Sequence, residues 1–234
     1  MTDAINTVIT QLKNMSGGYV CFTNVHATVM ARENKDFLAI TNESFMSLPD
    51  GKPVYWVGKL KGYNGLEQIP GPDFLPKLLA TKTVPPLRHY FYGGTQEVID
   101  NLVKKVKINY PAAEIVGAES PPFRKLSKDE VKESLQCMRD AKPDFIWVGL
   151  GAPKQEIWMA KHWQELKPAI LFGVGAAFDF HAGTIQRAPR WAQKLGLEWL
   201  HRLSQEPGRL WKRYFYTNSM FVLYLLRDLF SKHS

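Results

Sequence analysis

The chain has 234 residues, of which 45% are hydrophobic and 22% charged, and its formal net charge is +8. This is an ordinary globular composition, which excludes a disordered chain and a collagen-like repeat. Two cysteines without a C-x-x-C pair exclude a disulfide framework and a cysteine-based zinc site. The sequence shows neither a secretory signal nor about eighteen consecutive apolar residues, so we expect no membrane-spanning helix.

Short apolar runs alternate with helical patterns over the first four-fifths of the chain. The runs predict strands at residues 19–23, 45–48, 88–92, 114–116, 144–149 and 169–173. Helices are predicted at about 27–34, at 96–108, and from a capping box at 127–130 to about 141. This β-α-β-α order predicts an α/β fold with a mostly parallel sheet and helices on both faces.

The pattern changes near residues 187–190, after which only helices are predicted. We therefore divide the chain into a catalytic domain at 1–190 and a basic, aromatic helical appendage at 191–234. Residues 187–234 contain nine basic and three acidic side chains. Cations interleaved with aromatic rings suit an anionic surface such as nucleotide phosphates, lipid headgroups or nucleic acid. Helices that pack their aromatic rings against the core explain the same composition equally well.

Ligands of a parallel sheet bind beyond the carboxyl ends of its strands. Five predicted loops at that edge carry glycine or polar groups, at residues 23–26, 49–51, 93–95, 149–156 and 173–179. Glycine lets backbone N–H groups approach a phosphate, but for either of the loops at 149–151 and 173–175 alone, close packing of strand and helix is the favoured interpretation. Two of the loops begin like a dinucleotide fingerprint but lack its third glycine.

Pro153 is expected in the first turn of a helix, whose positive end favours an anion near Lys154 and Gln155. Asp50 lies between proline and glycine and could be either a general base or a turn residue. The local sequence alone favours the turn. Asp179 has the same two interpretations.

We expect no bound metal, because the chain contains no D-x-D or D-x-E triplet and its six histidines lack ligand spacing. If the chain acts on a nucleotide diphosphate, arginines of the appendage are the remaining source of positive charge.

Several longer motifs occur together in the second half of the chain. They are Gly173-Val-Gly-Ala-Ala-Phe-Asp-Phe-His-Ala-Gly183, Arg187-Ala-Pro-Arg-Trp191, Gly196-Leu-Glu-Trp-Leu200, Arg202-Leu203, Glu206-Pro207 and Arg209-Leu-Trp-Lys-Arg-Tyr214. With Pro49-Asp-Gly51, Gly93-Gly94 and Gly149-Leu-Gly-Ala-Pro-Lys-Gln-Glu156, they make residues 19–214 resemble the WecG/TagA/CpsF glycosyltransferases, glycosyltransferase family 26.

The resemblance implies a Rossmann-like domain with a helical appendage. It also implies inverting, metal-independent transfer of a hexose or N-acetylhexosamine from a UDP-sugar to a polyprenyl-diphosphate-linked saccharide, in bacterial surface polysaccharide synthesis. No cofactor is expected besides the donor substrate. Asp50 matches the family's proposed general base, which reverses the interpretation as a turn. The expected substrate-binding residues are Thr23, Asn24, Gly51, Gly93, Gly94, Gly151, Gln155, Gly175, Asp179, Arg202, Arg209 and Lys212.

Two positions depart from the family pattern. Phe22 stands where the family often has threonine, so Asn24 is a firmer expectation than the adjacent Thr23. Gln68 stands where the family often has arginine, which removes a cation that a uronic acid donor would use.

The resemblance also implies a cytoplasmic enzyme, peripheral on the inner face of the membrane. Residues 220–226, apolar and flanked by arginines, are too short to span a bilayer; they lie in its interface or pack on the catalytic domain. The sequence is compatible with both a monomer and a homo-oligomer. The rival functions are a nucleotide-binding oxidoreductase, whose ribose-binding acid is missing from its usual place, and a non-enzymatic binder of anionic lipid or nucleic acid. No nucleic-acid partner is expected of the enzyme.

Overall fold

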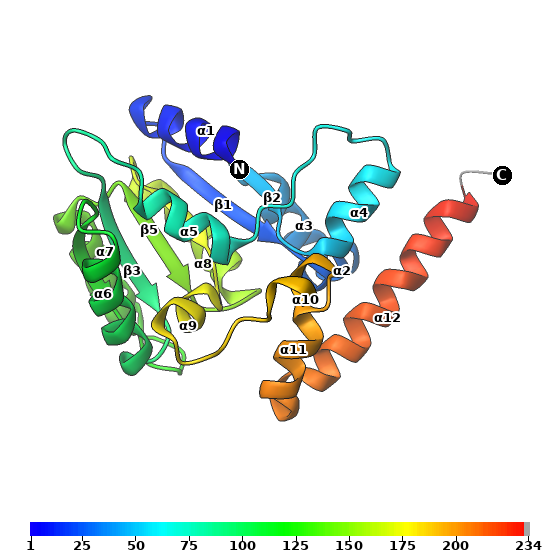
Figure 1. The fold of residues 1–234 in the computed structure, drawn as a ribbon. Helices are drawn as coiled ribbons and strands as arrows, with labels where there is room; N and C mark the ends of the chain where they lie inside the picture. The colour runs from blue at the N-terminus through cyan, green and yellow to red at the C-terminus, as the bar shows by residue number, and fades with distance from the viewer. Residues whose placement is uncertain (232–234) are drawn as a thin grey trace.

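The computed structural model describes residues 1–231; the last three residues of the predicted appendage, 232–234, lie outside the described part. Six parallel strands form one sheet in the order β2-β1-β6-β5-β3-β4. Their bounds are β1 Gly18–Thr23, β2 Met46–Pro49, β3 Arg88–Gly93, β4 Glu114–Glu119, β5 Phe145–Gly149 and β6 Ile170–Gly173. Figure 1 shows the sheet enclosed by helices and a long C-terminal helix at one side.

The central strands are apolar on both faces because each face is covered by helices. In β5, Phe145 and Trp147 pack on one face, whereas Ile146 and Val148 pack on the other, and all four are fully buried. Parallel strands buried in this way appear in the sequence as continuous apolar runs, which is why every predicted strand was found within three residues of its observed ends.

Two helical layers cover the sheet. The first consists of α1 Thr2–Lys13, α5 Gly71–Leu79, α6 Gln96–Asn109 and α9 Ala177–Ala182. The second consists of α2 Val25–Glu33, α3 Lys35–Asn42, α7 Lys128–Ala141, α8 Lys154–His162 and the short 3-10 helix Trp163–Leu166. The helix α4 Lys52–Leu60 follows β2 directly. The α/β prediction, with helices on both faces, is therefore confirmed.

The capping box that predicted α7 is present. The Ser127 hydroxyl accepts from the Glu130 N–H at 3.1 Å, and the Glu130 carboxylate accepts from the Ser127 N–H at 2.7 Å. The sequence patterns missed α1, α3, α4, α5 and α9. Of these, α3, α4 and α9 have nine residues or fewer, and α5 contains proline after its first turn.

After residue 189 the chain is helical, as expected, in α10 Arg190–Lys194, α11 Glu198–Gln205 and α12 Pro207–Ser231. One side of α12 packs on α2, where Arg32 forms a two-pronged ion pair with Asp228 and the Tyr216 and Tyr224 hydroxyls donate to Glu33. Its other side exposes large apolar side chains, including Phe215, Val222, Leu223 and Phe230. The two interpretations of the C-terminal segment therefore do not exclude each other.

Candidate active site

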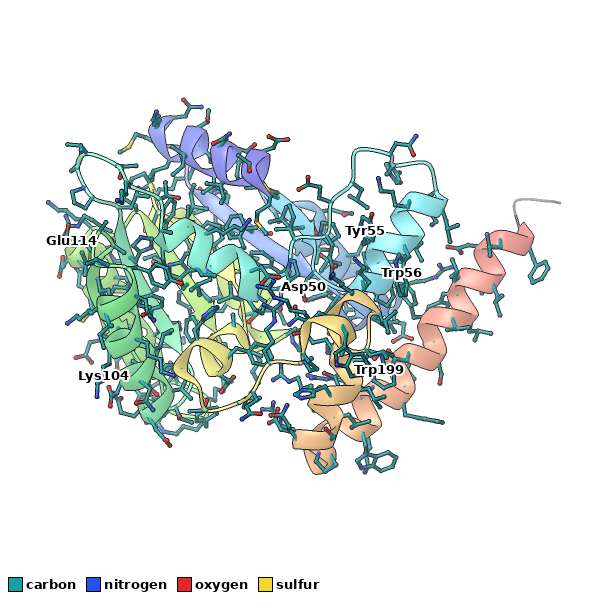
Figure 2. All side chains as sticks on the ribbon, viewed as in Figure 1. Asp50, Tyr55, Trp56, Lys104, Glu114 and Trp199 are labelled. Carbon is teal, nitrogen blue, oxygen red and sulfur yellow. The ribbon has the colours of Figure 1, made fainter. Side chains whose placement is uncertain are left out.

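Because all six strands are parallel, their carboxyl ends lie at one edge of the sheet. Four of the five predicted loops follow the adjacent strands β2, β1, β6 and β5, and the loop at Gly93 follows β3 on the far side of β5. The fold thus gathers the predicted site residues of the catalytic domain at this edge, and the appendage approaches the same edge. Figure 2 shows Asp50 where the sheet, α5 and α10 converge.

Asp50 is held in a fixed orientation directly after β2. Its backbone N–H donates to the Thr23 carbonyl at 2.9 Å, and its Oδ1 accepts from the backbone N–H of Gly71, in the first turn of α5, at 3.0 Å. The Gln68 amide donates to the Asp50 carbonyl at 2.8 Å. The residue keeps a partly exposed surface, although its carboxyl group is surrounded by protein. A carboxylate fixed in this way is pre-organised to accept a proton from a bound substrate.

The surroundings of Asp50 raise the pKa of its carboxyl to about 6. Burial is the largest cause, because it disfavours the charged form, and the negative charge of Glu198 acts in the same direction. Hydrogen bonds from the Gly71 N–H and the Asn24 side chain, and the positive charge of Arg187, lower the pKa and offset part of the effect. A carboxylate with this pKa is ionised at neutral pH, yet more basic than an exposed aspartate.

Asn24 supports Asp50 from β1. It caps α2, with its side-chain oxygen accepting from the Ala27 N–H at 3.2 Å, which fixes the side chain beside Asp50. Gly51 begins the α4 connection where a methyl group on it would lie 3.3 Å from the Asn24 Cα, so only glycine fits easily at this contact. Thr23 instead donates to or accepts from the Ser47 hydroxyl at 2.7 Å, on the opposite face of the strands from Leu48 and Asp50.

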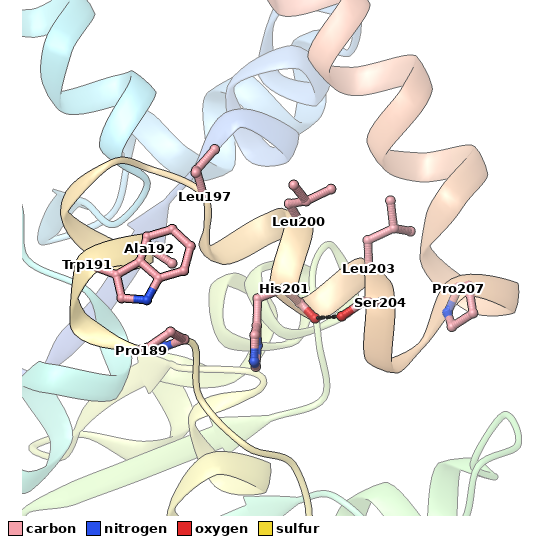
Figure 3. Close-up of a pocket in the computed structure, with 9 residues that line it drawn as sticks. All are labelled: Pro189, Trp191, Ala192, Leu197, Leu200, His201, Leu203, Ser204 and Pro207. Carbon is pink, nitrogen blue, oxygen red and sulfur yellow. Dashed lines mark hydrogen bonds between the residues drawn. The ribbon is translucent and has the colours of Figure 1, made fainter.

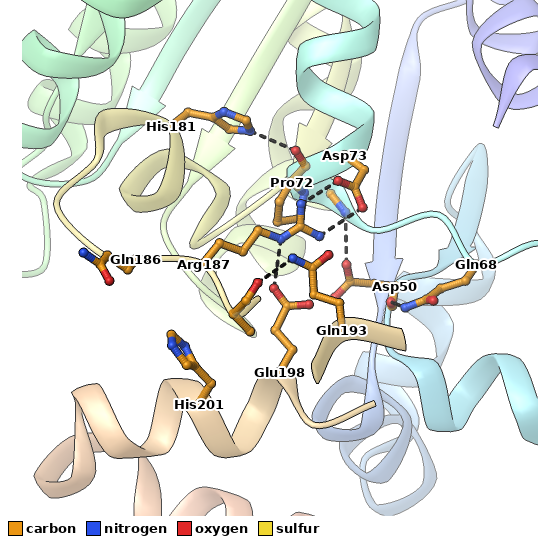
Figure 4. A network of polar contacts seen from close by, with 12 residues as sticks. Asp50, Gln68, Pro72, Asp73, His181, Gln186, Arg187, Gln193, Glu198 and His201 are labelled. Atoms are coloured by element: carbon orange, nitrogen blue, oxygen red, sulfur yellow. Dashed lines mark hydrogen bonds and ion pairs between the residues drawn. The ribbon is translucent and has the colours of Figure 1, made fainter. Parts of the chain in front are cut away.

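Arg187 links the catalytic domain to the appendage. Its two Nη atoms donate to both carboxylate oxygens of Asp73 in α5, one of them at 3.0 Å, and its Nε donates to Glu198 of α11 at 3.0 Å. Figure 4 shows this guanidinium between the two carboxylates, with Asp50 nearby. Because Asp73 lies two residues after Gly71, the same helix end orients Asp50 and receives the appendage.

The two glycine loops after β5 and β6 face each other across Gln155. This buried amide donates to the Gly173 carbonyl at 2.7 Å and to Glu156 at 2.9 Å, and its oxygen accepts from the Gly151 N–H at 3.1 Å. Gly175 lies against the Gln155 oxygen, whereas nothing lies within 4 Å of the position that a Cβ on Gly151 would occupy. Gly151 therefore borders open space while its N–H is bonded to Gln155, and Gln155 holds the two loops together.

Gly93 and Gly94 have a packing role. At Gly93, φ is +122° and a Cβ would lie 2.6 Å from the Gly149 carbonyl carbon. The Gly94 N–H donates to the Gly149 carbonyl at 3.2 Å, and a Cβ there would touch Val98. These glycines allow the ends of the paired strands β3 and β5 to approach each other closely, and their contact with a substrate stays a prediction.

A second charged group lies where α9 meets the appendage. Burial raises the pKa of Asp179, and the positive charges of Arg202 and Arg209 lower it, which places both cations near this carboxyl. Both arginines also pair with Glu206, at 3.4 Å and 2.7 Å respectively. Arg202 is mostly buried and lies over the Phe180 ring, 5.7 Å from its centroid. Three predicted residues, Asp179, Arg202 and Arg209, are therefore brought together.

Lys212 is placed less centrally. It is exposed on α12, and its ammonium lies 5.7 Å from the centroid of the neighbouring Trp211 ring. Its predicted contact with the donor stays a prediction. Arg213, in the second turn of α12, lies near the half-buried His26. Its charge helps to lower the pKa of His26 to about 4, although burial is the larger cause.

The residue analysis missed Arg187, Asp73 and Glu198 as site residues. Arg187 stands inside a motif that the resemblance used, but its partner Asp73 is 114 positions away, and no local spacing connects them. Within residues 1–231, no group of three or more histidine, cysteine, aspartate or glutamate side chains could hold a metal ion. In the same part of the chain, none of the helices combines the length and hydropathy needed to cross a membrane.

Similar proteins agree with the resemblance. The model of the glycosyl transferase WecG/TagA/CpsF family matches residues 1–234. A Bacillus spizizenii protein named N-acetylglucosaminyldiphosphoundecaprenol N-acetyl-beta-D-mannosaminyltransferase is 31% identical over 87% of this chain and 77% of its own length. A protein of the same name from Bacillus subtilis is 30% identical, covering 84% and 75%, and one from Staphylococcus aureus is 26% identical, covering 91% and 81%.

The family match covers the whole chain, including the appendage, so it accounts for both parts of the structure. It favours glycosyl transfer over the oxidoreductase and the non-enzymatic binder. The chain belongs to the WecG/TagA/CpsF family of glycosyl transferases.

Proposed function

We propose that this enzyme transfers an N-acetylhexosamine or a hexose from a UDP-sugar to a saccharide carried on a polyprenyl diphosphate, with inversion at the anomeric carbon and without a metal ion. The observation that carries the proposal is the Asp50 carboxyl, fixed by the α5 N-terminus at the edge of the sheet where the glycine loops and the appendage meet. The names of the relatives support the acceptor class and favour an N-acetylhexosamine.

In the proposed reaction, Asp50 takes the proton of the acceptor hydroxyl while that oxygen forms its bond to the anomeric carbon. The bond from this carbon to the UDP oxygen breaks on the opposite face, so a single displacement inverts the configuration. General-base assistance of this kind contributes roughly 10²–10⁴-fold. The raised pKa of Asp50 makes it a better proton acceptor than an exposed aspartate, at a pH where it is still ionised.

The leaving diphosphate is stabilised by cations of the appendage and by backbone dipoles. Arg202 and Arg209 lie near Asp179 at the end of the sheet, where they exchange Glu206 for the diphosphate. The N-terminus of α8, beside Gly151, adds its positive dipole end. Guanidinium groups suit this task because they are planar, always charged and bidentate toward phosphate.

The donor sugar lies beside Gln68 in the proposal. The Gln68 amide donates its hydrogen bond to the Asp50 carbonyl. The charged groups near Asp50 are the carboxylates of Glu198 and Asp73 and the guanidinium of Arg187, which pairs with both. This environment disfavours a carboxylate on the donor, so a neutral hexose or N-acetylhexosamine fits better than a uronic acid.

Because the proposed acceptor is carried on a lipid, the enzyme must act at a membrane surface. The exposed apolar side of α12, flanked by Arg213 and Arg227, suits an interface rather than a span. We expect the enzyme to act as a peripheral protein of the inner face of the cytoplasmic membrane. Liposome sedimentation of the full chain and of Phe215→Ser/Phe230→Ser tests this expectation; equal sedimentation of both would contradict it.

The direct test of function is an assay of full-length enzyme with a panel of UDP-sugars and a polyprenyl-diphosphate-linked N-acetylglucosamine acceptor, with product anomers assigned by NMR. We expect transfer from a neutral UDP-sugar, inversion, and full activity in EDTA. A retained anomeric configuration, or activity that EDTA abolishes and Mg²⁺ restores, would contradict the mechanism. Absence of transfer with every UDP-sugar would overturn the donor class.

A further inference from the structure

Outside the Asp50 site, the appendage contains a pocket of about 490 Å³ between α10 and α11. Its volume lies within the roughly 300–1,000 Å³ of small-molecule sites. The lining is almost wholly apolar: Trp191 and Ala192 come from α10, and Leu197, Leu200 and Leu203 from α11 and the residue before it. Figure 3 shows Leu200 and Leu203 on α11, Leu197 just before it, and Trp191 on the neighbouring α10.

The polar and apolar sides of α11 face in different directions. Glu198, Arg202 and Gln205 recur at helical spacing and contact Arg187, Phe180 and the backbone of Gln186, respectively. The leucines occupy the opposite side of the helix, by the same periodicity of 3.6 residues. One helix therefore contributes both to the charged site and to the apolar pocket.

The pocket shares α11 with the charged groups around Asp50, because its lining residue Leu197 directly precedes Glu198, which acts on the pKa of Asp50. Next to the lining residues Pro189 and Trp191 in the chain, α10 contains the exposed cations Arg190 and Lys194 and no acid. We call these two cations the cationic rim. Trp191 and Leu200 remain 62% and 48% exposed, which costs solvation free energy unless an apolar ligand covers them.

An apolar pocket with a cationic rim fits an amphiphile with an anionic head and a hydrocarbon tail. We infer that this pocket binds the first isoprene units of the lipid acceptor, with the diphosphate at the cationic rim and the saccharide at Asp50. The inference rests on the proposed acceptor class and gives the lipid a site on the protein itself, separate from the exposed face of α12 that contacts the membrane.

Binding of prenyl diphosphates to the full chain, free of lipid and detergent, tests the inference without requiring catalysis. Farnesyl diphosphate and methyl diphosphate are titrated against wild type, Leu200→Ser, Trp191→Ser and the control Ile108→Ser, an equally exposed apolar residue in the last turn of α6. We expect wild type and the control to prefer the farnesyl compound by on the order of tenfold or more, and both pocket variants to lose most of that preference.

An unchanged preference in both pocket variants, or no preference in wild type, would overturn the inference. So would pocket variants that lose only vesicle binding or only self-association, since the apolar side of α11 would then contact the bilayer or a second copy. Failure of the proposed function is distinguishable: transfer would then be absent with every acceptor while the farnesyl preference through Leu200 persisted.

Discussion

The two halves of the active site are built in opposite ways. Around Asp50 and Gln155, the side-chain groups are hydrogen-bonded within the catalytic domain, just beyond the ends of β2 and β5. Around Arg202 and Arg209, by contrast, the cations come from α11 and α12 of the appendage, pair with Glu206 and lie near Asp179.

This difference separates two tasks. A general base must be fixed in orientation and pKa, which a packed sheet edge provides. Cations that hold a diphosphate must release the product, and arginines that exchange one carboxylate for the ligand achieve this at low cost. Arg187 is the point where the two halves meet, because it binds Asp73 of the domain and Glu198 of the appendage.

The largest expected effect is at the fixed half. Asp50→Asn keeps the size of the side chain but removes the proton acceptor, so we expect the transfer rate to fall about 10²–10⁴-fold with UDP-sugar affinity unchanged. Single-turnover transfer and donor titration measure the two quantities. A variant that turns over like wild type would reduce Asp50 to a turn residue.

Substitutions around Arg202 and Arg209 should weaken binding of the UDP-sugar as well as lower the transfer rate. The variants Arg202→Gln and Arg209→Gln each remove one cation from the proposed diphosphate site. We expect kcat/KM for the UDP-sugar to fall by roughly 10²-fold in each, or about 3 kcal/mol per well-placed hydrogen-bond donor. Lys104→Gln, on the exposed side of α6, is the matched control for net charge. Equal, small losses in all three would indicate general steering of the anion.

The packing of the fixed half is tested at Gly93. In Gly93→Ala, the new methyl group meets Gly149 at a positive φ, so we expect the free energy of unfolding to fall by more than the ~1–3 kcal/mol typical of such strain alone. Gly62→Ala shares the positive φ, at +91°, but has nothing within 4 Å. Equal losses in chemical denaturation would show that the close approach of Gly93 to Gly149 contributes nothing to stability.

A substitution at Gln155 tests the same region and should have a smaller effect on stability. Gln155→Leu leaves the Gly151 N–H and the Gly173 carbonyl without their partners, which costs roughly 1–3 kcal/mol in a buried setting. We expect a lower free energy of unfolding and weaker donor binding. Weaker binding at unchanged stability would instead assign Gln155 a direct contact with the substrate, as the family resemblance implies.

The sequence predicted the strands well because their two-sided burial leaves continuous apolar runs, as in Phe145–Val148. It placed the predicted site loops at one edge of the sheet, and the parallel strands bring these loops together there. It could not distinguish Gly93, which packs, from Gly151, which borders open space, because both are glycines after strands. Nor could it find the Arg187–Asp73 pair, which depends on how a distant loop folds over α5.

The pH dependence of kcat/KM tests the central claim most directly. Because the protonated carboxyl cannot act as a base, activity should fall as the pH decreases through the Asp50 pKa of about 6. Glu198→Gln removes a negative charge that raises this pKa, so the acidic limb should move to lower pH, and Arg187→Met should move it to higher pH. The residual activity of Asp50→Asn should lack the limb. An acidic limb that stays at the same pH in Asp50→Asn would contradict the account.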